Sequence, residues 1–140
     1  MRNNQERISE IEKMNQKQRK YFWRNKLEMC IRCYACRNIC YACYCEECIF
    51  DNKDLRFSGK SRKFSEIFFY HIIRAFHMAG RCIECGECER VCPVDIPLSL
   101  INGKIQKDLA YYFDFKNAGI TEKEVSPLLV FDENDPNIFT

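Results

Sequence analysis

The stretch CIRCYACRNICYACYCEEC, residues 30–48, holds seven of the chain's eleven cysteines. It opens with cysteines at positions 30, 33, 36 and 40, which is a C-x2-C-x2-C-x3-C pattern. The stretch CIECGECERVC repeats this spacing at residues 82–92, and Pro93 follows it. One spacing used twice in one chain indicates two equivalent sites.

The cysteines are expected to be metal ligands rather than disulfides. Eleven is an odd number, and the first twenty residues contain no apolar core of a secretory signal. No apolar run reaches the roughly 20 residues that span a membrane. We therefore expect a cytoplasmic protein or soluble subunit whose thiols stay reduced. A net charge of +2 gives no reason to expect nucleic acid or a membrane surface as a partner.

The spacing predicts iron–sulfur clusters. Zinc sites typically use pairs of close ligands, whereas three cysteines at intervals of three suit the corners of a 4Fe–4S cube. In paired motifs of this kind the fourth cysteine ligates the other cluster. We therefore assign one 4Fe–4S cluster to Cys30, Cys33, Cys36 and Cys92, and a second to Cys82, Cys85, Cys88 and Cys40. Two zinc knuckles are the alternative.

Three cysteines remain outside this scheme: Cys43, Cys45 and Cys48, a C-x-C-x2-C run. They are candidates for a third site, holding an iron–sulfur cluster or zinc. A fourth ligand would then come from His71, His77, Asp51 or a partner protein. The alternative is a set of packed or redox-idle thiols.

The rest of the sequence predicts a mainly α fold. Helices are expected over residues 5–29, from an N-cap at Ser65 to Ala79, and from Pro97 to about Tyr112. In the second of these helices a stripe of apolar residues and His71 should be buried, with Tyr70, Arg74 and His77 on a polar face. Residues 51–64 resemble a loop. The predicted organisation is an N-terminal docking helix (1–29), a dicluster domain (30–115) and an extended C-terminal tail (116–140).

The double motif resembles bacterial-type dicluster ferredoxins. The apolar helix between the motifs and the segment CPVDIPLSLINGKIQKDL point to the α-helical ferredoxin branch, found in iron–sulfur subunits of heterodisulfide reductase and fumarate reductase. CIRCYACRNIC with CYCEEC, and AFHMAGRCIECGECERVCPVDIPL, look closer to iron–sulfur segments of formate dehydrogenase and hydrogenase beta-type subunits of anaerobes. The resemblance covers about residues 20–112. Tyr41 stands where that family usually has proline, and it retains an N–H.

These features predict an electron-transfer subunit with no catalytic site of its own. Clusters ligated only by cysteine have no open iron and carry one electron each. The expected partners are flavin- or metal-containing subunits of a larger oxidoreductase of anaerobic metabolism. The alternatives are a diffusible ferredoxin-like shuttle, a reductase with a catalytic cluster at Cys43, Cys45 and Cys48, and a zinc scaffold that binds nucleic acid.

Charges near the two motifs differ. Arg32 and Arg37 lie in the first, whereas the second contains Glu84, Glu87 and Glu89. Positive charge favours the reduced, more negative state, so the cluster at Cys30, Cys33 and Cys36 should have the higher reduction potential.

Overall fold

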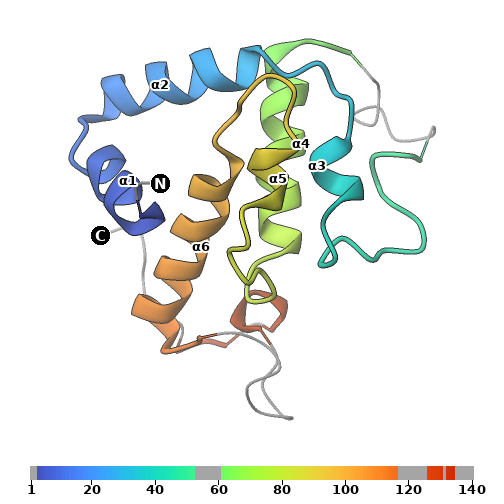
Figure 1. Ribbon diagram of the computed structural model, residues 1–140. Helices are drawn as coiled ribbons and strands as arrows, with labels where there is room; N and C mark the ends of the chain where they lie inside the picture. The colour runs from blue at the N-terminus through green and yellow to red at the C-terminus, as the bar shows by residue number, and fades with distance from the viewer. Residues whose placement is uncertain (1–2, 53–60, 117–125, 131, 135–140) are drawn as a thin grey trace.

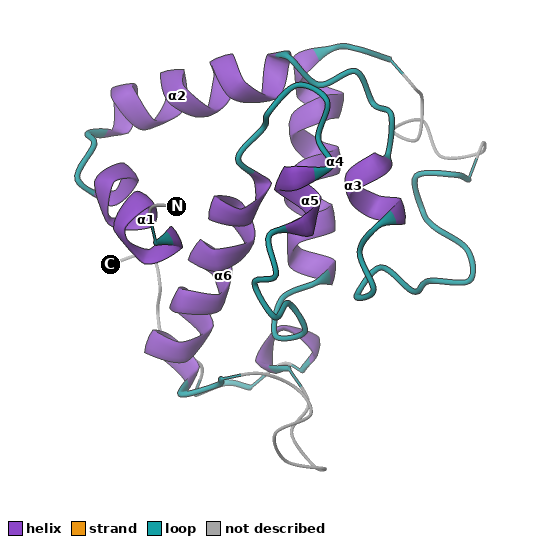
Figure 2. Cartoon of the chain, in the orientation of Figure 1, coloured by secondary structure: helices purple, strands orange, loops and turns teal. Residues whose placement is uncertain are grey.

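Two long helices, α4 and α6, run through the centre of the fold, with the shorter helices arranged around them (Figures 1 and 2). The computed structural model describes residues 3–52, 61–116, 126–130 and 132–134. The helices are α1 (Asn4–Glu12), α2 (Gln16–Glu28), α3 (Ala35–Asn38), α4 (Phe64–His77), α5 (Glu87–Arg90), α6 (Leu98–Phe113) and the 3-10 helix η1 (Pro127–Leu129). The described residues contain no strand, so the prediction of a mainly α protein is confirmed.

The helices pack in a few pairs. Helix α1 packs on α6, α2 packs on α4, and α4 packs on α6. The one-turn helices α3 and α5, one from each cysteine motif, contact each other, and α5 also contacts α6. The two motifs therefore lie against each other.

The N-terminal segment forms two helices, so the prediction of one helix over residues 5–29 was wrong. The Asn15 side chain accepts a hydrogen bond from the Gln18 amide (2.9 Å), and the Gln18 side chain accepts one from the Asn15 amide (3.0 Å). This capping box starts a new helix at Gln16. The break lets α1 turn back onto α6, where Ile8 is buried beside Gly103.

Helix α4 buries Ile67, His71 and Ala75 as predicted, but its buried face is wider than the apolar stripe. Its N-cap is Lys63 rather than Ser65. Tyr70 and Arg74, which the sequence assigned to a polar face, are 1% and 4% exposed, whereas Phe68 is 43% exposed. The prediction failed because polar groups of the first motif hydrogen-bond these two side chains, and apolar periodicity does not report such partners.

Cysteine side chains form part of the main core. The buried cluster combines them with aromatic and aliphatic residues: Leu27, Cys30, Tyr34, Cys36, Phe50, Ile67, Tyr70, Cys88, Ile96 and Leu98. Most of the predicted 51–64 loop and of the 116–140 tail lies outside the described residues. Within the tail, residues 127–129 form a 3-10 helix rather than an extended segment. No helix in the described ranges is both long and apolar enough to cross a membrane.

Gly80 and Gly86 provide a matched test of packing after α4. Both have positive φ, at 75° and 77°, so alanine at either costs roughly 1–2 kcal/mol. A Cβ at Gly80 would also lie 2.7 Å from Phe115 Cε1, whereas nothing lies within 4 Å of a Cβ at Gly86. We expect Gly80→Ala to lower the thermal midpoint of the loaded protein, at a fixed scan rate, clearly more than Gly86→Ala. Equal shifts would show that the contact with Phe115 does not matter.

Candidate metal centre

The two cysteine motifs share one backbone conformation. Arg32 and Glu84, at matching positions, both have φ 56°, and Tyr34 and Gly86 have φ 59° and 77°. The Arg32 amide donates to Sγ of the first cysteine of its motif, and the Glu84 amide does the same in the second (3.4 Å each). Repeated positive φ gives both loops the same curl between the first cysteine of the motif and the one-turn helix, α3 or α5, that follows.

The structure gathers the eight cysteines of these motifs around two cavities. The first-motif cavity is lined by Cys30, Cys33, Cys36 and Cys92. The second-motif cavity is lined by Cys40, Cys82, Cys85 and Cys88. Each cavity thus takes three cysteines from one motif and the fourth from the other. Across the described residues, no three His, Cys, Asp or Glu side chains converge where a single metal ion would sit.

Buried polar side chains contact the sulfurs of the first-motif cavity. His71 Nε2 lies 3.3 Å from Cys30 Sγ, and the Tyr70 hydroxyl lies 3.7 Å from Cys36 Sγ. Burial, together with the nearby guanidinium charges, lowers the pKa of His71 to about 3, so its imidazole is neutral. His71 therefore belongs to this cavity and not to a third site. Such contacts tune a cluster through hydrogen bonds to sulfur.

The second-motif cavity has its own donors. The Asn102 amide, buried on α6, points its Nδ2 at Cys88 Sγ (3.7 Å). The sequence analysis missed Asn102, whose only signal is an asparagine within a helix interior, where the residue is disfavoured. Tyr41 lines this cavity, and its hydroxyl donates to the Arg81 carbonyl (2.8 Å). The residue that replaces proline therefore ties the loop before the second motif to the loop after the first.

Burial and local contacts act on the thiols in opposite directions. Burial raises the pKa of Cys36, and it raises that of Cys88 to about 11. A hydrogen bond from Cys43 lowers the pKa of Cys40 to about 5. Metal binding needs thiolates, so iron must displace protons from the buried thiols.

Two buried guanidinium groups show whether the surroundings of the cavities suit a negatively charged cluster. Arg32 and Arg74 are 5% and 4% exposed, and the Nε of each has no hydrogen-bond partner. Arg32 donates to the Tyr34 hydroxyl (3.0 Å), and Arg74 donates to the Cys36 carbonyl (2.7 Å). Neither forms an ion pair with a carboxylate of the described residues. A buried cation without a counter-charge is costly, and iron–sulfur clusters bound by thiolates would supply negative charge beside both.

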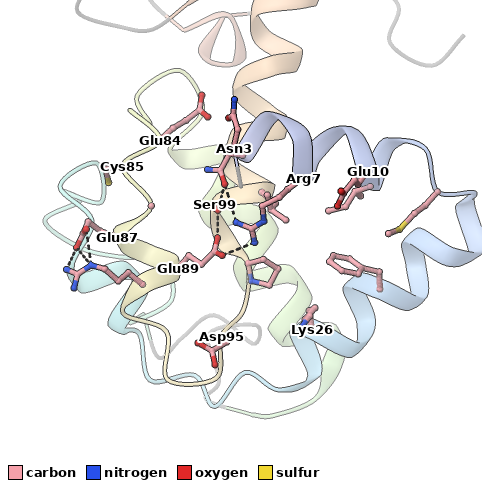
Figure 3. Close-up of a pocket in the computed structure, with 18 residues that line it drawn as sticks. Asn3, Arg7, Glu10, Lys26, Glu84, Cys85, Glu87, Glu89, Asp95 and Ser99 are labelled. Carbon is pink, nitrogen blue, oxygen red and sulfur yellow. Dashed lines mark hydrogen bonds and ion pairs between the residues drawn. The ribbon is translucent and has the colours of Figure 1, made fainter. Parts of the chain in front are cut away.

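Two of the three acidic residues of the second motif have arginine partners. Glu87 pairs with Arg90, while Glu89 pairs with Arg7 (2.8 Å) and accepts a hydrogen bond from Ser99 (Figure 3). They line an open groove of about 1070 Å³ beside α1 and α2. Cys85, an exposed thiol, lies at its edge.

The remaining cysteines line neither four-cysteine cavity. Cys43, Cys45 and Cys48 line a separate pocket together with His77 and Asp51. Two of the candidate fourth ligands from the sequence are therefore close to these thiols.

A 4Fe–4S binding domain model matches residues 76–97. The chain contains a 4Fe–4S ferredoxin-type segment, and the class predicted from the cysteine spacing is confirmed.

Two curated relatives refine the comparison. The chain is 39% identical over 84 residues to the F420-dependent formate dehydrogenase subunit beta of Methanocaldococcus jannaschii, covering 60% of this chain and 22% of that protein. It is 38% identical over 93 residues to the F420-dependent formate dehydrogenase 1 subunit beta of Methanococcus maripaludis, covering 64% of this chain and 23% of that protein. The match spans less than a quarter of either relative. No solved structure matches the chain. The predicted resemblance to formate dehydrogenase beta-type segments is confirmed.

Replacing Arg74 tests the charge argument. Arg74→Met removes the cation but keeps much of the side-chain volume, so bound clusters would lose their buried counter-charge. We expect iron release to a chelator to accelerate about tenfold or more, equivalent to about 1.4 kcal/mol. Arg90→Met, which removes an exposed arginine paired with Glu87, is the control and should leave the rate unchanged. Equal rates in both variants would refute a role for Arg74 in holding the cofactor.

Proposed function

We propose that this chain is the electron-transfer segment of a formate dehydrogenase-type oxidoreductase and carries two 4Fe–4S clusters. Cys30, Cys33, Cys36 and Cys92 hold the first, and Cys82, Cys85, Cys88 and Cys40 hold the second. The observation that carries the proposal is the pair of cavities, each lined by three cysteines of one motif and one of the other. The relatives' names support the kind of complex.

The chain's own residues hold, insulate and tune the bound clusters. When bound, each cluster takes up and releases one electron. Arg32 and Arg74 offset the negative charge, Asn102 donates to one sulfur, and the ring nitrogen Nε2 of His71 contacts another. Each cavity has one exposed cysteine, Cys33 or Cys85, and three that are less exposed. The two exposed cysteines give each site one edge at the surface where electrons enter or leave.

The proposed setting is a cytoplasmic complex with flavin- or metal-containing subunits. Formate oxidation releases two electrons, and two one-electron carriers pass them on singly. By analogy with the relatives' names, the relay lies between formate and F420. Co-purification with larger subunits supports this proposal, while monomeric elution of the native protein favours the diffusible shuttle. A colourless, iron-free protein would favour the remaining alternative, a zinc scaffold that binds nucleic acid.

Exchanging single ligands tests the crossed assignment. Cys92→Ser should remove the same electron paramagnetic resonance signal as Cys33→Ser, because both residues line the first-motif cavity. Cys40→Ser should remove the same signal as Cys85→Ser. Iron and sulfide analysis of anaerobically purified protein should show about four irons lost in each variant. If Cys92→Ser instead removed the signal lost in Cys85→Ser, each motif would hold its own cluster.

Two neutral substitutions test the predicted order of potentials. Arg32→Gln removes a buried cation beside the first-motif cavity and should lower that cluster's potential by on the order of 50–100 mV at an effective dielectric constant of about 20. Glu87→Gln removes an acid that already pairs with Arg90 at the surface, so solvent and its partner screen the change. Its effect on the second cluster should be several-fold smaller. A redox titration followed by electron paramagnetic resonance measures both, and equal shifts would contradict the charge argument.

A further inference from the structure

A pocket of about 340 Å³ lies outside the two four-cysteine cavities. It contains all three cysteines that the two proposed clusters leave unused: Cys43, Cys45 and Cys48. These thiols come from the turn region that follows the first motif, and they approach the C-terminal half of α4, where Arg74 and His77 lie. The pocket is called the arginine pocket below.

Three arginines line this pocket along with the thiols: Arg37, Arg74 and Arg81. Arg37 pairs with Asp51 (2.8 Å), and Arg81 stacks over the Tyr44 ring, 4.7 Å from its centroid. Arg74 is almost fully buried, its Nε has no partner, and it forms no ion pair with any carboxylate in the described ranges. Asp51 and Glu46 are the acidic residues of the lining, and Asp51 is already paired. The pocket therefore combines thiol ligands with surplus positive charge.

We propose that the arginine pocket binds a third iron–sulfur cluster through Cys43, Cys45 and Cys48. A cluster held by three thiolates is an anionic group, and it would give Arg74 a counter-charge on this side of α4. Asp51 and His77 line the same pocket and are the side chains placed to approach an iron that lacks cysteine.

The arrangement of the thiols favours a cluster over zinc. A tetrahedral zinc site needs its donors to meet around one point at about 2.0–2.3 Å. The side chains of the arginine pocket do not converge in this way in the described structure, and neither do the two four-cysteine sets. Three thiols that line one pocket without meeting at a single point share this feature with the four-cysteine sets, which suit a group wider than one ion.

The pocket also lies next to the second-motif cavity. Cys40 Sγ and Cys43 Sγ both contact Met78 Sδ, at 3.3 and 3.6 Å. Cys40 lines the second-motif cavity and Cys43 lines the arginine pocket, and the two thiols also hydrogen-bond each other, so the two sites are immediate neighbours. A third cluster here would extend the proposed relay, and to that extent the inference rests on the proposed function.

The test is a metal count on the full chain, purified without oxygen together with any subunits that accompany it. The triple variant Cys43→Ser, Cys45→Ser, Cys48→Ser should lose about four irons relative to the unaltered protein. The signals removed by Cys33→Ser and by Cys85→Ser should both remain. Glu47→Gln, in the same turn region but outside the lining of the pocket, is the control and should keep all the iron.

Every other outcome overturns the inference. A triple variant with unchanged iron shows that the three thiols hold no cluster, and loss of one zinc in place of iron identifies a single-ion site. If the triple variant does not fold, Cys45→Ser replaces it. The Cys45 side chain is exposed, and its loss should remove or alter only the third signal. Unaltered protein whose only signals are those assigned to the two four-cysteine sets overturns this inference alone, whereas iron-free protein overturns the proposed function as well.

Discussion

The exchange of one cysteine between the two motifs is the constraint on which the fold depends. Cys40 follows the first motif's helix yet lines the second-motif cavity, and Cys92 does the reverse. Because α3 and α5 contact each other, each loop can reach across with its fourth thiol. Any group bound in either cavity would then tie together two segments about fifty residues apart in sequence. Such a cross-link restricts the unfolded chain as well as the folded one.

Helix α4 carries side chains that act on cysteines of both motifs. Its buried face carries Tyr70 and Arg74, which contact Cys36. The guanidinium of Arg74 also acts electrostatically on Cys88 and Cys43. Because the Arg74 guanidinium is deeply buried and has no carboxylate partner among the described residues, it destabilises the fold unless another negatively charged group binds beside it. A negatively charged cofactor bound beside Arg74 would therefore stabilise the fold, as in other proteins whose metal ligands are assembled only in the folded state.

The cysteine spacing predicted more of the site than of its surroundings. A repeated C-x2-C-x2-C-x3-C pattern fixes which thiols can share a turn, so the two sets of four that the structure gathers were readable from sequence. The break before Gln16 was missed, although Asn15 and Gln18 form a recognisable capping box. The buried face of α4 was predicted only in part, because Tyr70 and Arg74 look like surface residues until their partners around Cys36 are placed.

Arg32 is the buried charged residue that lies beside only one of the two four-cysteine cavities. The acids of the second motif were expected to depress its potential, but Glu87 and Glu89 have arginine partners at the surface. Arg74 acts on thiols of both motifs, so it shifts both sites in the same direction and cannot separate them. Arg32 lines only the first-motif cavity and is almost fully buried. Because burial weakens screening by solvent and salt, this buried guanidinium should influence the first site more strongly than the more exposed acids influence the second.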